Sequence, residues 1–225
     1  MERHFDEELK TLKEKLLQMA SLVEEAIAGS VRSLVDRRIE LAKGVIRSDE
    51  AINMLEIDVD ELCLKLLALH QPIATDLRFI ASAMKINSDL ERMGDLAVNI
   101  AERSLELLAE PTLKPLIDIP RMAELAQKMV KDSLDAFVNR DAELARNVCC
   151  RDDEVDTLND QVFRELLTYM MEDPKAIHRA VDLILIGRHI ERIADHATNI
   201  GEDVVYMVKG KTIKHHIEEK KGEGR

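Results

Sequence analysis

The sequence predicts an all-α protein, a tandem repeat of two three-helix bundles whose six long helices are related by a pseudo-two-fold axis. The main observation is an internal repeat: residues 30–63 match residues 133–166 without a gap, and residues 89–102 return as 189–202. A unit of about a hundred residues indicates a duplicated domain and not a solenoid of short units. Composition agrees, because charged residues make up 34% of the chain and aromatic residues 3%, as is typical of long helices with solvated faces.

Apolar side chains at alternating steps of three and four predict three helices in the first copy. These helices follow residues 9–34, 41–69 and 73–109. Asp36 stands before the second helix and is expected to cap it. Pro72 separates the second helix from the third, since proline ends a helical pattern.

The second copy repeats this plan after a proline-rich linker at 110–120. Its helices are expected at about 121–139, 141–171 and 175–208. Long helices joined by short turns pack as antiparallel bundles. We therefore expect three parts, namely a first three-helix bundle at 1–112, a second three-helix bundle at 118–209 and a flexible charged tail at 210–225.

Charge and hydropathy exclude several classes of protein. The net charge of -12 argues against binding to nucleic acid, whose phosphates require Lys and Arg. No apolar run approaches the ~20 residues of a membrane span, and the start of the chain lacks the apolar core of a signal peptide. Cys63, Cys149 and Cys150 are interpreted as structural thiols of a reducing compartment. The cysteines therefore fit a reducing compartment.

The repeated segment places a row of oxygen-bearing side chains on one helix of each copy. At about 100° per residue, the four members of a row fall within roughly 80° of one another. They are Glu91, Asp95, Asn99 and Glu102 in the first copy and Glu191, Asp195, Asn199 and Glu202 in the second. A further row on the preceding helix holds Asp49, Asn53, Glu56 and Asp60 in the first copy and Asp152, Asp156 and Asn159 in the second, where Phe163 replaces the last acid. If the two helices of a copy are neighbours, their rows can meet.

Clustered carboxylates that occur twice predict a metal site in each copy, because packing alone rarely requires the same acidic pattern twice. Hard or borderline cations prefer oxygen ligands, so the expected ions are divalent or ferric: iron, zinc, manganese or magnesium. The predicted ligands are Glu91, Asp95, Asp49 and Glu56 in the first copy and Glu191, Asp195, Asp152 and Asp156 in the second. His196 is interpreted as a residue at the rim of the second site.

Other interpretations stay open. The acidic rows can be solvated helix faces, or they can bind Arg and Lys of partner proteins without any metal. The enzymatic alternative is a carboxylate-bridged di-iron enzyme, but such sites use Glu-x-x-His, and no His here has Glu three residues before it. The chain also shows no nucleophile–His–acid set and no Gly-rich phosphate loop. We therefore predict no catalytic residues and no enzymatic activity.

The doubled segment carries a family resemblance. It reads Glu91-Arg-Met-Gly-Asp-Leu-Ala-Val-Asn-Ile-Ala-Glu102 and Glu191-Arg-Ile-Ala-Asp-His-Ala-Thr-Asn-Ile-Gly-Glu202. This pair resembles the twin signature of the PhoU family, the accessory regulators of the phosphate-specific transport system. Gln71-Pro-Ile-Ala-Thr-Asp-Leu-Arg78 is similar to that family's turn before its third helix. The likeness covers residues 9–209.

The resemblance implies two three-helix bundles, a cytoplasmic homodimer and repression of the phosphate-starvation response. It also implies two partners at the inner membrane face, the ATPase of the phosphate ABC transporter and the phosphate-sensing histidine kinase. The family's Glu/Asp-x-x-x-Asp motifs, linked in some members to multinuclear iron or other divalent metals, map onto Glu91 with Asp95, Glu191 with Asp195, and Asp152 with Asp156. Asn53 stands where the other copy has Asp156, a departure that bears on the coordination of the first site. We therefore expect a non-enzymatic, metal-binding adaptor that regulates phosphate uptake.

Overall fold

The computed structural model describes residues 2–211 and 213, and every regular element within them is a helix. The first half holds α1 (Glu2–Val35), α2 (Ile39–His70) and α3 (Ala74–Leu108). The second half holds α4 (Asp118–Asn139), α5 (Ala142–Cys149), α6 (Asp152–Glu172), the short 3-10 helix η1 (Pro174–Ala176) and α7 (Ile177–Lys209). The predicted all-α class is confirmed. Most of the tail expected at 210–225 lies outside the described residues.

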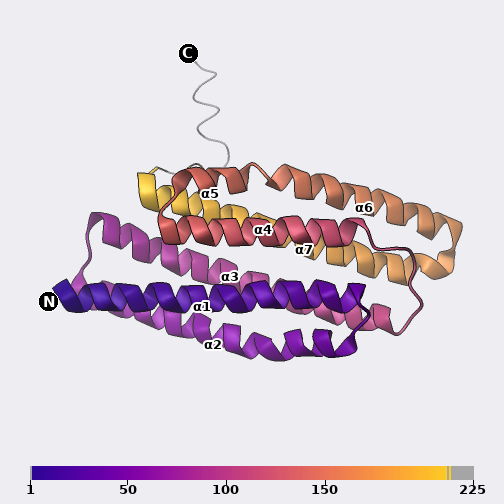
Figure 1. Ribbon diagram of the computed structural model, residues 1–225, viewed down its shortest axis with the longest axis horizontal. Helices are drawn as coiled ribbons and strands as arrows, with labels where there is room; N and C mark the ends of the chain where they lie inside the picture. Colours follow the sequence, from indigo (N-terminus) through magenta and orange to yellow (C-terminus); the bar gives the residue numbers. More distant parts are fainter. Residues whose placement is uncertain (1, 212, 214–225) are drawn as a thin grey trace, which may run out of the picture.

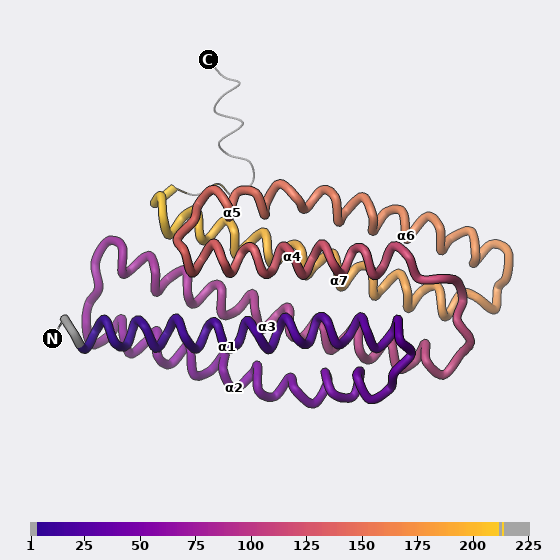
Figure 2. The backbone as a smooth tube through the Cα atoms, viewed as in Figure 1, coloured from indigo at the N-terminus to yellow at the C-terminus, as the bar shows by residue number. Residues whose placement is uncertain are grey.

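Each half folds as a three-helix bundle, and the two bundles lie side by side along their lengths (Figure 1). In the first bundle α1, α2 and α3 pack against one another, while in the second α4, α5 and α6 pack on α7. The bundles meet mainly through α3 and α7, and also through α1 and α4. Figure 2 shows the connection from α3 to α4 at one end of the molecule, where the end of α3 comes beside the start of α7.

One continuous apolar core runs through both bundles. Leu12, Leu16 and Met19 on the inner face of α1 are fully buried, at the three-and-four spacing that predicts the helix. Phe79 of α3 stacks on Phe137 of α4, with ring centroids 5.4 Å apart, and so joins the two cores. Within the described part of the chain, no helix has both the length and the apolar character needed to span a membrane.

The repeat is also visible in the backbone of the first turn of each bundle. Arg37 and Arg140 occupy corresponding positions, and both adopt a left-handed φ of 53°. Asp141 then caps α5 by accepting two backbone N–H groups, but the corresponding residue before α2 is Arg38, which makes no side-chain cap. The prediction that Asp36 caps α2 is wrong, because the chain turns after Asp36 and the helix begins only beyond Arg38.

The single helix expected at 141–171 is divided into α5 and α6 by Cys150 and Arg151. The side chain of Arg151 bonds to Asp132 of α4, which holds the turn against the bundle. Three consecutive acids at 152–154 fill the first turn of α6, where negative side chains interact favourably with the helix dipole. That acidic run is the sequence signal for a new helix start, whereas the spacing of apolar residues does not show one. The six-helix plan therefore holds with its fifth helix in two pieces.

Candidate functional site

Helices α2 and α3 place the two predicted rows of the first bundle against each other. Asp49 comes from α2, and Glu91 and Asp95 come from α3. Gly94 permits the close approach, since a Cβ there would lie 3.2 Å from the Ile52 side chain and 3.8 Å from Asp49 Oδ1. The glycine directly before Asp95 therefore brings the row on α2 within electrostatic reach of the row on α3.

The charges of these two rows act on one another. Burial raises the pKa of Asp49, and the negative charge of Asp95 raises it further. Burial also raises the pKa of Glu91, with further increases from Asp95 and Glu56. Asn53 offsets part of the increase in the pKa of Asp49, because its Nδ2 donates to Asp49 Oδ2 at 2.9 Å. Asn53 thus supports the first site as a hydrogen-bond donor to an acidic residue.

The second bundle repeats the arrangement with α6 and α7. Burial raises the pKa of Asp152 to about 6, together with the charges of Asp195 and Asp156. Burial likewise raises the pKa of Asp156 and of Glu191, and the charge of Asp195 raises both further. The pKa of Asp195 is itself raised by burial and lowered by the nearby His196. In both bundles, therefore, burial and neighbouring acids raise the pKa values of the row carboxylates.

In each bundle, one described carboxylate oxygen of the acidic rows is buried away from hydrogen-bond donors. Asp49 Oδ1 and Asp152 Oδ1, at corresponding positions of the repeat, are buried and meet no donor at hydrogen-bond geometry, although the Thr198 hydroxyl lies close enough to Asp152 to lower its pKa. A buried polar atom without a partner is destabilising, and a carboxylate oxygen can be satisfied by a cation as well as by a donor. This shared pair of atoms, surrounded by further carboxylates, is the feature of the rows that fits a bound metal ion.

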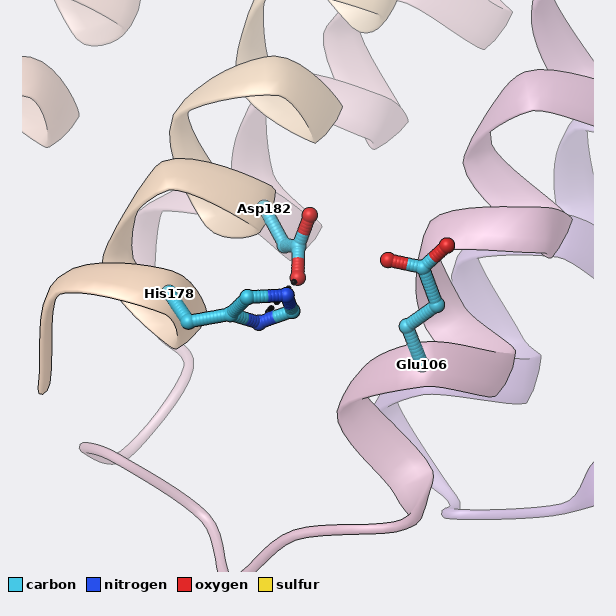
Figure 3. A group of neighbouring side chains, drawn as sticks. All are labelled: Glu106, His178 and Asp182. Carbon is cyan, nitrogen blue, oxygen red and sulfur yellow. Dashed lines mark ion pairs between the residues drawn. The ribbon is translucent and has the colours of Figure 1, made fainter. Parts of the chain in front are cut away.

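The rows do not converge to metal-binding distances with their present side-chain conformations. Within the described part of the chain, the group whose ligand atoms all lie within 4.8 Å of one another is Glu106, His178 and Asp182, and not any three members of the rows (Figure 3). Carboxylates without a counter-ion repel one another and so spread apart. Ligation by the eight predicted residues stays a prediction, and it requires rotation of their side chains.

His196 and Asp60, which the sequence analysis placed at or near the rows, contact other side chains of this protein. His196 Nδ1 lies 2.8 Å from Asp89 Oδ1 of α3, so His196 connects the two bundles instead of only lining the rim of the second site. Asp60, the last acid of its row, accepts a hydrogen bond from Asn87 Nδ2 at 3.0 Å. These two side chains therefore stabilise the packing of neighbouring helices.

The repeat has a counterpart among known proteins. A family model described as the PhoU domain matches the chain twice, at residues 16–104 and at residues 119–204. The chain belongs to the PhoU family. The two matches coincide with the two bundles, and the resemblance carried by the doubled signature is confirmed.

PhoU relatives match nearly the whole chain. The phosphate-specific transport system accessory protein PhoU homolog of Aquifex aeolicus is 47% identical over 214 residues, which cover 95% of this chain and 97% of the relative. The crystal structure of PhoU from Pseudomonas aeruginosa has a TM-score of 0.90 and 42% identity, covering 92% of this chain and 100% of that one. The phosphate transport system regulatory protein PhoU from Streptococcus pneumoniae has a TM-score of 0.86 and 32% identity, covering 93% and 99%. These relatives carry the names of accessory and regulatory proteins.

The sequence interpretation missed the cluster of Glu106, His178 and Asp182. One signal was available, because His178 and Asp182 are four residues apart on one helix and so share a face. The cluster is absent from the repeat pattern, since the first copy has Arg78 and Ser82 at the positions that correspond to His178 and Asp182. Repetition, which revealed the acidic rows, therefore could not reveal this group.

Proposed function

We propose that this PhoU-family protein is a non-enzymatic regulator of phosphate uptake and of the phosphate-starvation two-component response. In this role it is a metal-binding adaptor between the ATPase of the phosphate ABC transporter and the sensor histidine kinase. It acts as a cytoplasmic homodimer at the inner membrane face. The names of the relatives support this proposal, since they are accessory or regulatory proteins of phosphate transport systems.

The observation that carries the metal-binding part is the pair of opposed carboxylate rows, present once in each bundle. In the first bundle the pKa values of Asp49 and Glu91 are raised by burial and by neighbouring acids. In the second bundle the same causes raise the pKa values of Asp152 and Glu191. Repelling carboxylates around a buried oxygen without a donor favour a divalent or ferric cation, which neutralises the charge and takes up the free oxygen.

A cation held by these rows has ligands from the helices on one side only. Its remaining coordination positions face solvent and are able to accept phosphate, water or a carboxylate of a partner protein. The charge of the ion dominates the local field, so a protein with a net charge of -12 can approach an anion or an acidic surface there. Signalling is then a change in affinity for the two partners between metal-loaded and metal-free states.

A metal-free adaptor is the second candidate function. The observation in its favour is that no three members of the rows converge within 4.8 Å in the described part of the chain. In this case the rows contact Lys and Arg side chains of the partners directly. The two candidates predict the same regulatory phenotype and differ in whether that phenotype depends on bound metal.

Deletion of the gene in its source organism tests the regulatory role. We expect phosphate-starvation genes to stay expressed in phosphate-rich medium, and the wild-type gene to restore repression. The double substitution Asp95→Ala with Asp195→Ala should fail to restore it. The matched control is Glu50→Ala with Glu172→Ala, which removes two exposed acids from the same two helices as Asp49 and Asp152 and should restore repression.

Two results would contradict the proposal or redirect it. Normal repression in a clean deletion, in a strain without a second family member, would remove the regulatory role. If the double substitution abolishes repression but leaves the metal content of the purified protein unchanged, the metal-free adaptor is the correct form of the function.

A further inference from the structure

A cluster of one histidine and two carboxylates lies where the two bundles meet. Glu106 comes from the last turn of α3, while His178 and Asp182 come from the first turns of α7. Each residue offers a ligand atom within 4.8 Å of those of the other two. Figure 3 shows the imidazole of His178 beside the carboxylate of Asp182, with the carboxylate of Glu106 facing them from α3.

Asp182 carries a buried oxygen that no hydrogen bond satisfies. The residue is 3% exposed, and its Oδ2 has no hydrogen-bond partner although it lies 3.2 Å from His178 Nδ1. Its other oxygen, Oδ1, lies 3.4 Å from Arg103 Nη1. Because a buried carboxylate is destabilising unless its charge is compensated, Oδ2 is the atom of this cluster that requires a further partner.

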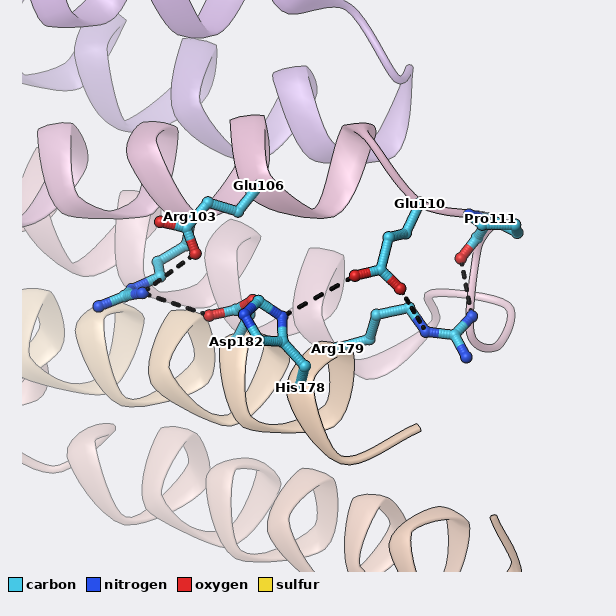
Figure 4. A network of polar contacts seen from close by, with 7 residues as sticks. All are labelled: Arg103, Glu106, Glu110, Pro111, His178, Arg179 and Asp182. Atoms are coloured by element: carbon cyan, nitrogen blue, oxygen red, sulfur yellow. Dashed lines mark hydrogen bonds and ion pairs between the residues drawn. The ribbon is translucent and has the colours of Figure 1, made fainter. Parts of the chain in front are cut away.

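Arg103 contacts one oxygen of the Glu106 carboxylate and one oxygen of the Asp182 carboxylate. Its Nη1 lies 3.3 Å from Glu106 Oε2 and 3.4 Å from Asp182 Oδ1, so that one guanidinium group bridges the two helices (Figure 4). The second oxygen of each carboxylate remains for another ligand. Arg103 therefore fixes the positions of two donor groups on opposite sides of the bundle interface.

Charged side chains of both signs meet around the cluster. Glu110 adds a third carboxylate, with Oε1 4.0 Å from His178 Nδ1 (Figure 4). Arg179 Nε lies 3.3 Å from Glu110 Oε2 and balances that acid. Arg103 lies between the other two carboxylates and Lys175 lines the same hollow, so the unpartnered Oδ2 of Asp182, and not net charge, is the feature that favours an added cation.

The donor set identifies the class of cation. One imidazole nitrogen with two carboxylates suits zinc and other first-row divalent transition metals, whereas magnesium and calcium prefer oxygen alone. Ligand atoms at about 2.0–2.2 Å from zinc lie at most about 4.4 Å apart, so small side-chain movements close the site. We propose that Glu106, His178 and Asp182 bind a zinc-like divalent cation that joins α3 of the first bundle to α7 of the second.

The site is accessible to solvent, and a cation bound there would connect the two bundles. The His178 side chain is 68% exposed, and His178 and Asp182 line an open hollow together with Arg103 and Lys175. A cation can therefore enter from solvent and keep a water ligand. Because the ligands come from both bundles, binding stabilises their present arrangement over any arrangement that separates α3 from α7. This site is independent of the acidic rows and of the proposed regulatory function.

Zinc binding to the full-length protein tests the proposal. The background is the fourfold variant Glu91→Ala, Asp95→Ala, Glu191→Ala and Asp195→Ala, which disables the acidic rows. Equilibrium dialysis against Zn²⁺, followed by elemental analysis, should find one zinc per chain in this background. Adding His178→Ala should weaken zinc binding by at least about tenfold, as expected for the loss of a metal ligand. The matched control Glu14→Gln removes an exposed acid of α1, away from the cluster, and should change the affinity less than about twofold.

Two further measurements test the proposal even if the fourfold variant fails to fold. If the fourfold variant does not fold, His178→Ala in the wild-type protein should lower the zinc stoichiometry by one. Crystals grown with zinc should give an anomalous peak at the zinc edge between Glu106 and His178. No zinc in the background protein, or equal zinc affinity with and without His178→Ala, would overturn the proposal and leave an ion-pair network only. If the acidic rows bind no metal while this cluster binds zinc, the metal-binding part of the proposed function is contradicted and the proposal for this cluster stands.

Discussion

His196 of α7 lies against Asp89 of α3, with Nδ1 2.8 Å from Oδ1, and so links the two bundles through a largely buried pair. In the repeat, Asp89 corresponds to His189 and His196 corresponds to Leu96. The two copies therefore differ at both positions of this contact. If both copies kept an acid at the first position and a histidine at the second, a two-fold arrangement would form this pair twice, whereas here the divergence leaves it once at the interface.

The His196–Asp89 pair should contribute measurably to stability. A double-mutant cycle with Asp89→Ala and His196→Ala, read by urea unfolding, is expected to give a coupling energy of about 1 kcal/mol, because the side chains are only 15% and 17% exposed. The control is the Lys10–Glu14 pair of α1, whose side chains are 76% and 63% exposed and whose coupling should stay below about 0.5 kcal/mol. Equal coupling in both pairs would contradict a specific role at the interface.

Local patterns predicted most of the fold. The spacing of apolar residues gave the helices of the first copy to within a few residues at most ends, because a helix that buries one face must repeat that face along its length. The repeat gave the architecture of both bundles. The break after Cys149 was missed, because apolar periodicity continues across it while the helix start is marked only by the acids at 152–154.

The candidate sites could also be predicted from the sequence only in part. The facing of Asp49 and Glu91 was predictable, because both rows recur in the repeat and belong to consecutive helices. Side-chain convergence was not predictable, since it depends on rotamers and on repulsion between the acids. The grouping of Glu106 with His178 was also beyond the sequence, because residues 72 positions apart meet only through the packing of α3 on α7.

The raised pKa of Asp152 predicts a pH dependence in the metal-free protein. Its value is about 6 in the folded state against an ordinary 3.8, so the folded protein binds more protons than the unfolded protein between these values. The destabilisation is therefore fully present above pH 6 and is relieved as the pH falls through 6. Asp152→Asn should stabilise the protein at pH 7 by about 1 kcal/mol, a figure reduced for the partial solvent exposure of the carboxylate.

Urea unfolding in the presence of a chelator, at pH 7 and at pH 5, measures this effect. The advantage of Asp152→Asn should shrink at pH 5, where the wild-type carboxyl is largely protonated. Glu50→Gln, at an exposed position of α2 outside these interactions, should show no comparable change. An advantage of the same size at both pH values would show that repulsion among the acids is not its cause.

Two glycines should respond in opposite directions to alanine. A Cβ at Gly201 of α7 would lie 2.9 Å from the backbone oxygen of Ala145 and 3.2 Å from Cys149 Sγ, so Gly201→Ala should destabilise the protein by about 1–3 kcal/mol. A Cβ at Gly44 of α2 would meet nothing within 4 Å, so Gly44→Ala should stabilise it by about 0.5–1 kcal/mol. Urea unfolding of both variants checks this, and destabilisation by Gly44→Ala would refute the close approach as the distinguishing cause.

Metal content, measured together with the melting temperature, tests the carboxylate rows most directly. Asp95→Ala or Glu91→Ala should lower the bound metal at the first bundle, and Asp195→Ala or Glu191→Ala at the second. Each should shrink the rise in Tm that added metal gives to the wild type. With a chelator present, the same changes should be neutral or mildly stabilising, because they relieve repulsion. Equal metal content and equal Tm response in the wild type and all four variants would contradict metal binding by the rows.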